Sequence, residues 1–248
     1  MLSLHSLPAS WAPAAAPVHS SARSSSVTME TKADLVALAE QLNPVVGYWD
    51  PLQLADQEFW GTSNEATIGF LRESEIKHGR IAMFGFVGYI VHENDIRTQG
   101  DAIAQAVPTG LSAPAVWDAL PEIAKWQIIL FVGVMEALRE NKAVLAGDGE
   151  KHYMSGGKPG YFPTFDMVPH PTPLNLFDPF GNMKAKTEES KARGRLVELN
   201  NGRLAMIGLF GFLSEATVPG SVPFLKGGLI PEYTGEVMAP FAKNIFTL

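Results

Sequence analysis

"ESEIKHGRIAMFGF", residues 73–86, places four charged side chains and a histidine directly before an apolar segment. The chain repeats this arrangement as "LVELNNGRLAMIGLFGF", residues 196–212. With Glu75 aligned to Glu198, seven of fourteen positions are identical at a separation of 123 residues. Identity of this order at a fixed separation indicates an internal duplication. The other identical pairs are Gly79/Gly202, Arg80/Arg203, Ala82/Ala205, Met83/Met206, Gly85/Gly208 and Gly88/Gly211.

Both copies lie in segments that we expect to be long helices. The first begins with the capping-box pattern "TSNE" at Thr62 and continues to about Glu93. The third covers about residues 188–216, and a middle helix covers residues 121–140, with proline in its first turn. Apolar residues at helical spacing in 35–42 predict a further short amphipathic helix.

Composition limits the classes to which this protein can belong. The 248 residues carry a net charge of -7 and contain no cysteine, which excludes disulfides, thiol catalysis and iron–sulfur clusters. No basic cluster is present that could follow a phosphate backbone, so we expect no nucleic-acid partner. Residues 1–29 contain eight serines, one arginine and no acidic residue, and are either an organelle transit peptide or a disordered tail. Residues 30–248 are expected to form one domain.

The duplication predicts how the charged residues pair. Glu75 and Arg80 lie about 140° apart around one helix, so they cannot pair with each other. One helix separates the two copies, so if all three helices span a membrane, both copies run in the same direction and are related by a two-fold axis. Glu75 can then reach Arg203 while Glu198 reaches Arg80. Small residues at every third position would allow close approach of the two helices: Gly79, Ala82, Gly85, Gly88, Gly202, Ala205, Gly208 and Gly211.

Hydropathy alone leaves two alternatives for these helices. The apolar run from Ile81 to Val91 has 11 uncharged residues, fewer than the about 18 that identify a membrane span. The helices could therefore be amphipathic helices of a soluble bundle, with solvated charges. Paired charges are tolerable inside a membrane, whereas a lone charge costs at least about 2.5–3.5 kcal/mol.

The repeated charges also carry possible metal ligands. His78 follows Glu75 by three residues, and Asn201 follows Glu198 by three, so each helix offers two donors one turn apart. A di-iron centre would need a second Glu-x-x-His motif, and asparagine stands in that position here. Carboxylate, amide and imidazole instead suit a metal that needs a single axial ligand, such as the magnesium of chlorophyll.

The two repeated stretches resemble the first and third transmembrane helices of the chlorophyll-binding light-harvesting antenna family, and its red-lineage branch most closely (chlorophyll a/c, fucoxanthin- or peridinin-type). "GYWDPLQLA", residues 47–55, and "LNLFDPFGNM", residues 174–183, resemble the loops that precede those helices. The resemblance covers roughly residues 44–235. It implies an all-α membrane protein with three transmembrane helices, the first and third forming a pseudo-two-fold crossed pair, plus short amphipathic helices.

The resemblance also implies roles for individual residues. Axial magnesium ligands of chlorophyll would be Glu75, His78, Gln127, Glu136, Glu198, Asn201 and Glu215. Ion-pair support would come from Arg80, Arg203 and Arg139, the last neutralising Glu136 one turn away. Gln127 precedes Glu136 by nine residues rather than the eight of green-plant members, and Glu215 is either a ligand or a solvated helix end. The carotenoid-binding loops would use Asp50, Pro51, Asp178 and Pro179, although Gln53 replaces the usual glycine in the first loop.

The function implied by the resemblance is physical rather than enzymatic. The protein would bind chlorophyll a, chlorophyll c and xanthophylls of the fucoxanthin, peridinin or diadinoxanthin type, and pass excitation energy to a photosystem. The expected location is the plastid thylakoid membrane, with photosystem I or II, neighbouring antenna subunits and lipids as partners. A photoprotective family member that dissipates excitation is one alternative. A transporter built on parallel repeats is another.

Overall fold

A computed structural model of the chain describes residues 30–97, 107–165, 178, 180–183 and 185–237. All regular secondary structure in these ranges is helical, which confirms the all-α class for this part of the chain. The predicted short helix is α1 (Lys32–Leu42). The transit-peptide region and Pro179 fall outside the described residues. The other short helices are η1 (Leu54–Asp56), η2 (Phe59–Gly61), α4 (Ala113–Ala119), α6 (Lys142–Gly147), η3 (Tyr153–Ser155) and η4 (Pro223–Leu225).

Three long helices are present where the sequence predicts them. They are α2 (Asn64–Glu93), α5 (Glu122–Glu140) and α7 (Glu188–Thr217). The predicted capping box at Thr62 is wrong, because the N-cap of α2 is Ser63, whose hydroxyl accepts the Ala66 N–H. Thr62 instead ends the preceding turn η2, where its hydroxyl donates to the Phe59 carbonyl.

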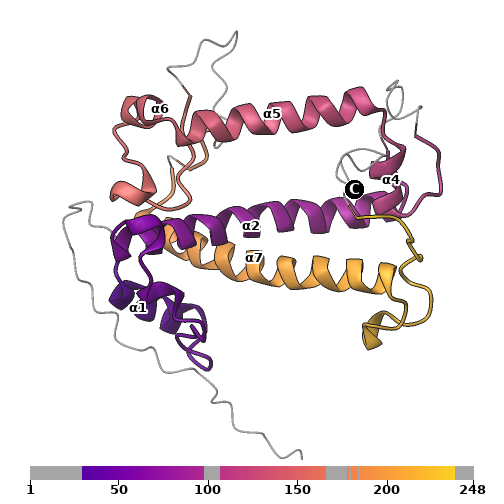
Figure 1. The fold of residues 1–248 in the computed structure, drawn as a ribbon, viewed down its shortest axis with the longest axis horizontal. Coiled ribbons are helices and arrows are strands. Elements are labelled where there is room, and N and C mark those ends of the chain that lie inside the picture. Colours follow the sequence, from indigo (N-terminus) through magenta and orange to yellow (C-terminus); the bar gives the residue numbers. More distant parts are fainter. Residues whose placement is uncertain (1–29, 98–106, 166–177, 179, 184, 238–248) are drawn as a thin grey trace, which may run out of the picture.

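The duplicated helices α2 and α7 lie side by side and run in the same direction, as the repeat predicts (Figure 1). Helix α5 runs in the opposite direction on the other side of α2, and α4 and α6 lie near its two ends (Figure 1). Helix α1 lies near the beginning of α2, where the Asn200 side chain of α7 donates to the Leu42 carbonyl. The charged ends of all three long helices therefore meet on one side of the molecule.

The helices α2 and α7 cross where glycine meets glycine. A Cβ atom on Gly202 would lie 2.9 Å from the Gly79 Cα atom, and one on Gly79 would lie 3.1 Å from the Gly202 Cα atom. Any side chain at either position would push the two backbones apart. Ala82 and Ala205, the next small residues of each copy, are buried beside this crossing.

About one turn after Ala82 and Ala205, each helix packs a large side chain against a glycine of the other. A Cβ atom on Gly208 would lie 2.9 Å from Phe86, and a Cβ atom on Gly85 would lie 3.0 Å from Leu209. Phe86 and Leu209 occupy equivalent positions of the repeat, so the packing follows the two-fold relation. The prediction that Gly88 and Gly211 also permit close approach is wrong, because a Cβ atom on either would meet nothing within 4 Å. At 100° per residue, Gly88 lies about 180° around the helix from Gly79, and Gly211 likewise from Gly202, so both face away from the crossing.

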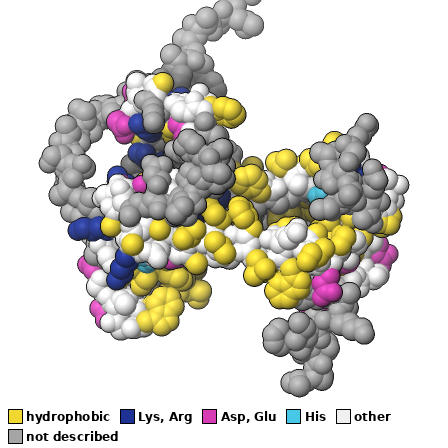
Figure 2. Space-filling model, turned by 90° about the horizontal axis from the view of Figure 1, so that it is seen from above, with side chains coloured by type: hydrophobic (Ala, Val, Ile, Leu, Met, Phe, Trp, Pro, Cys, Tyr) yellow, Lys and Arg dark blue, Asp and Glu magenta, His cyan; other side chains and the backbone are white. Residues whose placement is uncertain are grey.

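Away from the crossing, the long helices expose apolar side chains. Phe84 is 79% exposed on α2, and Phe210 is 75% exposed on α7, with Ile81 and Leu204 beside them. On α5, large apolar residues are exposed at most positions from 123 to 134. Figure 2 shows hydrophobic side chains over the middle of the molecule and charged side chains mainly toward its ends. Among the described residues, no helix has the length and apolarity together that crossing a membrane requires.

Candidate functional site

Two reciprocal ion pairs join the duplicated helices next to the Gly79–Gly202 crossing. The Arg203 side chain donates from Nε and Nη2 to Glu75 Oε1, at 2.7 and 2.6 Å. The Arg80 Nε atom donates to Glu198 Oε1 at 2.5 Å. These are the pairings that the duplication predicts. Each guanidinium reaches across the interface at the depth where the glycines bring the backbones together.

The two glutamates nevertheless differ in how their oxygens are used. The second oxygen of Glu75, Oε2, accepts a hydrogen bond from Arg72 Nη1 at 2.5 Å. The second oxygen of Glu198 has no hydrogen-bond donor within the described part of the chain. The residue equivalent to Arg72 in the repeat is Arg195, and its side chain is exposed. Glu198 therefore offers an uncommitted carboxylate oxygen, whereas both oxygens of Glu75 are engaged.

His78 and Asn201 are both exposed on their helices, one turn beyond these glutamates. The Nδ1 atom of His78 lies 2.8 Å from the Ser74 carbonyl oxygen, which can only accept a hydrogen bond. Nδ1 must therefore carry the proton, and Nε2 is left as an electron-pair donor. This arrangement, with one ring nitrogen donating to a carbonyl, is usual for a histidine that binds a metal.

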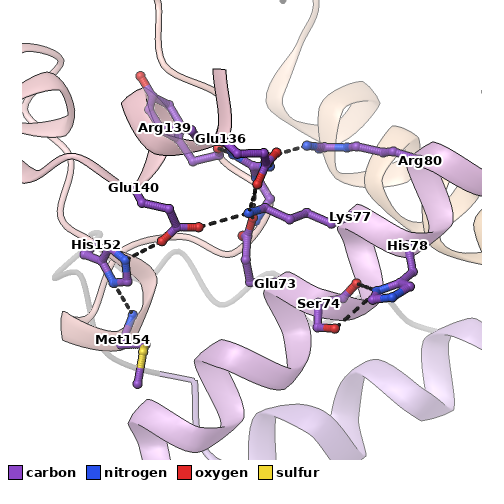
Figure 3. A network of polar contacts seen from close by, with 12 residues as sticks. Glu73, Ser74, Lys77, His78, Arg80, Glu136, Arg139, Glu140, His152 and Met154 are labelled. Carbon is purple, nitrogen blue, oxygen red and sulfur yellow. Dashed lines mark hydrogen bonds and ion pairs between the residues drawn. The ribbon is translucent and has the colours of Figure 1, made fainter. Parts of the chain in front are cut away.

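Helix α5 meets α2 through a second group of charged side chains (Figure 3). The predicted ion pair of Arg139 with Glu136 is present but long, at 4.0 Å from Nη1 to Oε1, and the closest ion pair of Arg139 is with Glu73. The closer charge partner of Glu136 is Lys77, whose Nζ atom lies 2.5 Å from Oε2. Lys77 also donates to Glu140 at 2.9 Å.

The sequence analysis did not predict that Glu73, Lys77 and Glu140 take part in the site. Their spacing could have indicated it. Glu73 and Lys77 are four residues apart on α2, and Glu136 and Glu140 are four apart on α5, so each pair shares a helix face. A cation between two such faces can bind carboxylates of both. The remaining Glu140 oxygen pairs with His152 Nε2 at 2.7 Å.

The two remaining predicted ligands have contrasting surroundings. Gln127 is exposed on α5. Glu215 is buried near the end of α7, and its two oxygens accept the Gly220 and Val222 backbone N–H groups, each at 2.8 Å. The alternative of a solvated helix end is therefore wrong for Glu215. Its carboxylate fixes the loop that follows the helix.

The Asp-Pro loops before α2 and α7 share one conformation. Asp50 accepts backbone N–H groups four and five residues ahead, from Leu54 and Ala55, both at 3.0 Å. Asp178 likewise accepts from Asn182 and Met183, both at 2.8 Å. The Ala55 and Leu54 N–H groups, with the Tyr48 hydroxyl, hold the pKa of Asp50 below its ordinary value. The duplication thus extends beyond the helices into the loops that precede them.

Gln53 occupies the position in the first loop that Gly181 occupies in the second. Both have positive φ, +53° for Gln53 and +68° for Gly181, so the loop keeps its shape despite the missing glycine. We expect Gln53→Gly to raise the free energy of unfolding by about 0.5–1 kcal/mol. A non-glycine residue in the left-handed conformation carries strain of about 1–2 kcal/mol. Glycine relieves this strain, and the backbone entropy that it loses on folding costs less, about 0.5–1 kcal/mol.

Denaturant unfolding of the refolded protein measures this difference, and Gly181→Ala is the matched change of opposite sign. A loss of stability in Gln53→Gly would mean that the glutamine side chain itself stabilises the loop, and would overturn the strain argument.

The candidate donors occur singly rather than as a cluster. Within the described ranges, no three His, Asp or Glu side chains converge to hold a bare metal ion. His78 Nε2, a Glu136 oxygen, a Glu198 oxygen and the Asn201 amide each stand on a different helix turn with one available electron-pair donor. This chemistry fits a hard metal that brings its equatorial ligands with it and needs one axial donor. A duplicated helix pair with such donors defines a helical scaffold for magnesium pigments.

Comparison with known proteins agrees with that class. The model of the family described as chlorophyll A-B binding protein matches residues 36–217, and the chain therefore belongs to this family. It is 31% identical over 232 residues to a chloroplastic fucoxanthin-chlorophyll a-c binding protein of Trieres chinensis, covering 90% of this chain and 98% of the relative.

Two further relatives indicate the same branch. The chain is 34% identical over 206 residues to fucoxanthin-chlorophyll a-c binding protein F of Phaeodactylum tricornutum, covering 82% of this chain and 88% of the relative. It is 33% identical over 182 residues to fucoxanthin-chlorophyll a-c binding protein E of Macrocystis pyrifera, covering 68% of this chain and 69% of the relative. The predicted resemblance to red-lineage antennae is thereby confirmed.

Proposed function

We propose that this protein is a light-harvesting antenna: it holds chlorophylls and carotenoids at fixed separations and transfers excitation energy to a photosystem. The observation that carries the proposal is the duplicated site, in which cross-helix Glu–Arg pairs fix exposed donor atoms on a crossed helix pair. The pigments supply light absorption and energy transfer, and no bond is made or broken, so the protein is not an enzyme.

The chain's own residues do three things in this function. The Gly79–Gly202 contact and the two ion pairs set the crossing of α2 and α7. The Ser74 carbonyl holds the His78 ring in the tautomer that leaves Nε2 to bind a metal. The Arg80 side chain neutralises Glu198 and leaves its second oxygen as a donor. Rigid placement matters because excitation transfer depends on the spacing and orientation of the pigments.

The proposed ligands differ in whether they keep a donor atom that no other group engages. His78, Glu136, Glu198 and Asn201 are the proposed magnesium ligands with an available donor atom, and Gln127 is a fifth on an exposed face of α5. Glu75 is proposed as a weaker ligand, since Arg72 and Arg203 engage both of its oxygens. Glu215 is proposed to shape its loop rather than to bind a pigment.

The pigments are proposed to be chlorophyll a, chlorophyll c and a fucoxanthin-type carotenoid. Support comes from the relatives, each of which is named a fucoxanthin-chlorophyll a-c binding protein. The two Asp-Pro loops, with equivalent backbone geometry around Asp50 and Asp178, are proposed to hold the ends of two carotenoids.

The helices α2, α5 and α7 are proposed to cross the thylakoid membrane. At 1.5 Å per residue, the 30 residues of α2 and of α7 extend about 45 Å, against about 30 Å for the hydrocarbon core. The exposed apolar side chains of α5 support this placement, because lipid or pigment would cover them. The charges of α2 gather toward one end and are paired, which reduces the cost of inserting them.

Targeting to the plastid is proposed to depend on residues 1–29, removed as a transit peptide to leave one pigment-binding domain in residues 30–248. The acid-free, serine-rich composition of that segment supports this, as do the chloroplastic relatives. Photosystem cores, neighbouring antenna subunits and thylakoid lipids are the proposed partners. The mass of the mature protein and its resistance to carbonate extraction from thylakoids test cleavage and membrane insertion.

The test of the main proposal is the absorption and fluorescence-excitation spectrum of the protein purified in mild detergent. We expect a red chlorophyll a emission that is excited through chlorophyll c and carotenoid bands, because a connected antenna funnels energy to its lowest-energy pigment. A folded, colourless protein would contradict the proposal. Emission excited only through chlorophyll a would show bound pigment without an antenna.

A further inference from the structure

The Lys77 ammonium group lies between two helices and close to three carboxylates (Figure 3). Its Nζ atom is 2.5 Å from Glu136 Oε2, 2.9 Å from Glu140 Oε1 and 4.0 Å from Glu73 Oε1. Glu136 and Glu140 belong to α5, and Lys77 belongs to α2. Lys77 is therefore a charge link between the duplicated pair of helices and the middle helix.

Of these carboxylates, only Glu136 keeps an oxygen available for a ligand role. Glu73 is buried, with its oxygens bound by Arg139 and by the Gly160 backbone N–H. Both oxygens of Glu140 are also bound, one by Lys77 and one by His152. The Glu136 side chain is 48% exposed, and no donor in the described part of the chain is within hydrogen-bond distance of its Oε1.

The guanidinium on the same helix is committed elsewhere. Arg139 is buried, forms its ion pair with Glu73, and donates from Nε to the Tyr161 carbonyl at 3.1 Å. The Phe162 ring packs over it, with its centroid 5.9 Å from the Arg139 Cζ atom. These contacts hold Arg139 with its nearest nitrogen 4.0 Å from Glu136, beyond hydrogen-bond distance.

We propose that Lys77 is the positioning residue of the α5 pigment site: it neutralises Glu136 and holds Oε2, so that Oε1 is left to bind a chlorophyll magnesium. This inference rests on the proposed function, since it takes Glu136 as a ligand. A fixed ammonium group beside a carboxylate lowers the cost of placing that charge on an apolar helix face, and it leaves the second oxygen as an electron-pair donor for magnesium. The pigment on one helix thus depends on a residue of another.

The test uses the full chain refolded with chlorophyll a, chlorophyll c and fucoxanthin, and measures chlorophyll per polypeptide and visible circular dichroism. We expect Lys77→Met to weaken binding of one chlorophyll by about 10–100-fold, the usual cost of removing a residue that supports a metal ligand. Lys77→Arg keeps the charge and should retain that chlorophyll. Glu140→Gln is the matched control, because it removes the other ion pair of Lys77 and leaves Glu136 paired.

A double substitution separates charge neutralisation from general structural damage. The amide in Glu136→Gln is a neutral donor that needs no counter-ion, so Lys77→Met in that background should cost no chlorophyll. Equal losses from Lys77→Met with and without Glu136→Gln would overturn the proposal. If Lys77→Met alone does not fold, comparing Glu136→Gln with the double variant decides the question, because the proposal requires equal chlorophyll content and equal dichroism.

The same experiment distinguishes this inference from the proposed function. A wild-type protein that binds no chlorophyll would contradict both the antenna function and the role of Lys77. A wild-type protein that binds chlorophyll, together with a Lys77→Met variant that binds it equally well, would remove the role of Lys77 and leave the antenna function standing.

Discussion

Replacing Arg80 with leucine is expected to destabilise the protein more than the same replacement at Arg203, although the two residues are equivalent in the repeat. Arg80 is the cation paired with Glu198 in the described part of the chain, so Arg80→Leu leaves that carboxylate without a counter-ion. Loss of one partner of a desolvated ion pair costs about 3–5 kcal/mol. We expect a cost approaching that range in the pigment complex, where apolar ligands cover the helix pair.

The equivalent variant, Arg203→Leu, leaves Glu75 paired with Arg72 at 2.5 Å. Its expected cost is therefore about 1.5–3 kcal/mol, that of a hydrogen bond lost to a charged group. Guanidinium chloride unfolding of the refolded pigment complex, followed by visible circular dichroism, compares the two variants under identical conditions. An Arg203→Leu variant as unstable as Arg80→Leu would show that Arg72 does not compensate.

A double variant tests whether charge imbalance is the cause. Glu198→Gln combined with Arg80→Leu removes both charges, so the double variant should be more stable than Arg80→Leu alone. With the wild type and Glu198→Gln alone, these variants complete a double-mutant cycle, which gives the interaction free energy of the Arg80–Glu198 pair. Absence of any recovery would mean that Arg80 acts mainly through its hydrogen bond to the Gly160 carbonyl, at 2.8 Å.

The contacts that the sequence could predict are those imposed by the duplication. Two copies running the same way leave one cross-helix arrangement for Glu75 with Arg203 and Glu198 with Arg80, and the structure has it. The glycines that repeat with the charges predict where the helices cross. Gly88 does not belong to this set, because a spacing of three residues drifts around a helix of 3.6 residues per turn and takes Gly88 off the crossing face.

The contacts that the sequence could not predict break the symmetry of the repeat. Arg139 has a carboxylate three residues before it, yet it pairs with Glu73, which is 66 residues away. Local spacing favours the near partner, and only the tertiary approach of α5 to α2 reveals the buried one. Glu215 is a similar case, because its partners belong to a loop that folds back onto the helix end.

Adding a single methyl group at Gly202 is expected to separate the duplicated helices. The Cβ atom of Gly202→Ala would lie 2.9 Å from the Gly79 Cα atom, and a backbone atom cannot rotate away as a side chain can. Overpacking of this kind costs about 1–3 kcal/mol and occasionally more. Both ion pairs flank the crossing, so they would lengthen together. We expect lower stability and weaker visible circular dichroism, because pigments on the two helices would move apart.

Gly194→Ala is the matched control on the same helix, since a Cβ atom there would meet nothing within 4 Å. Alanine is favoured over glycine inside a helix by about 0.8–1.0 kcal/mol, so Gly194→Ala should stabilise the protein while Gly202→Ala destabilises it. The same substitution is thus expected to have opposite signs eight residues apart. If Gly202→Ala also stabilised the protein and left its dichroism unchanged, helix propensity would outweigh the crossing, and the glycines could not be what sets the spacing of the pair.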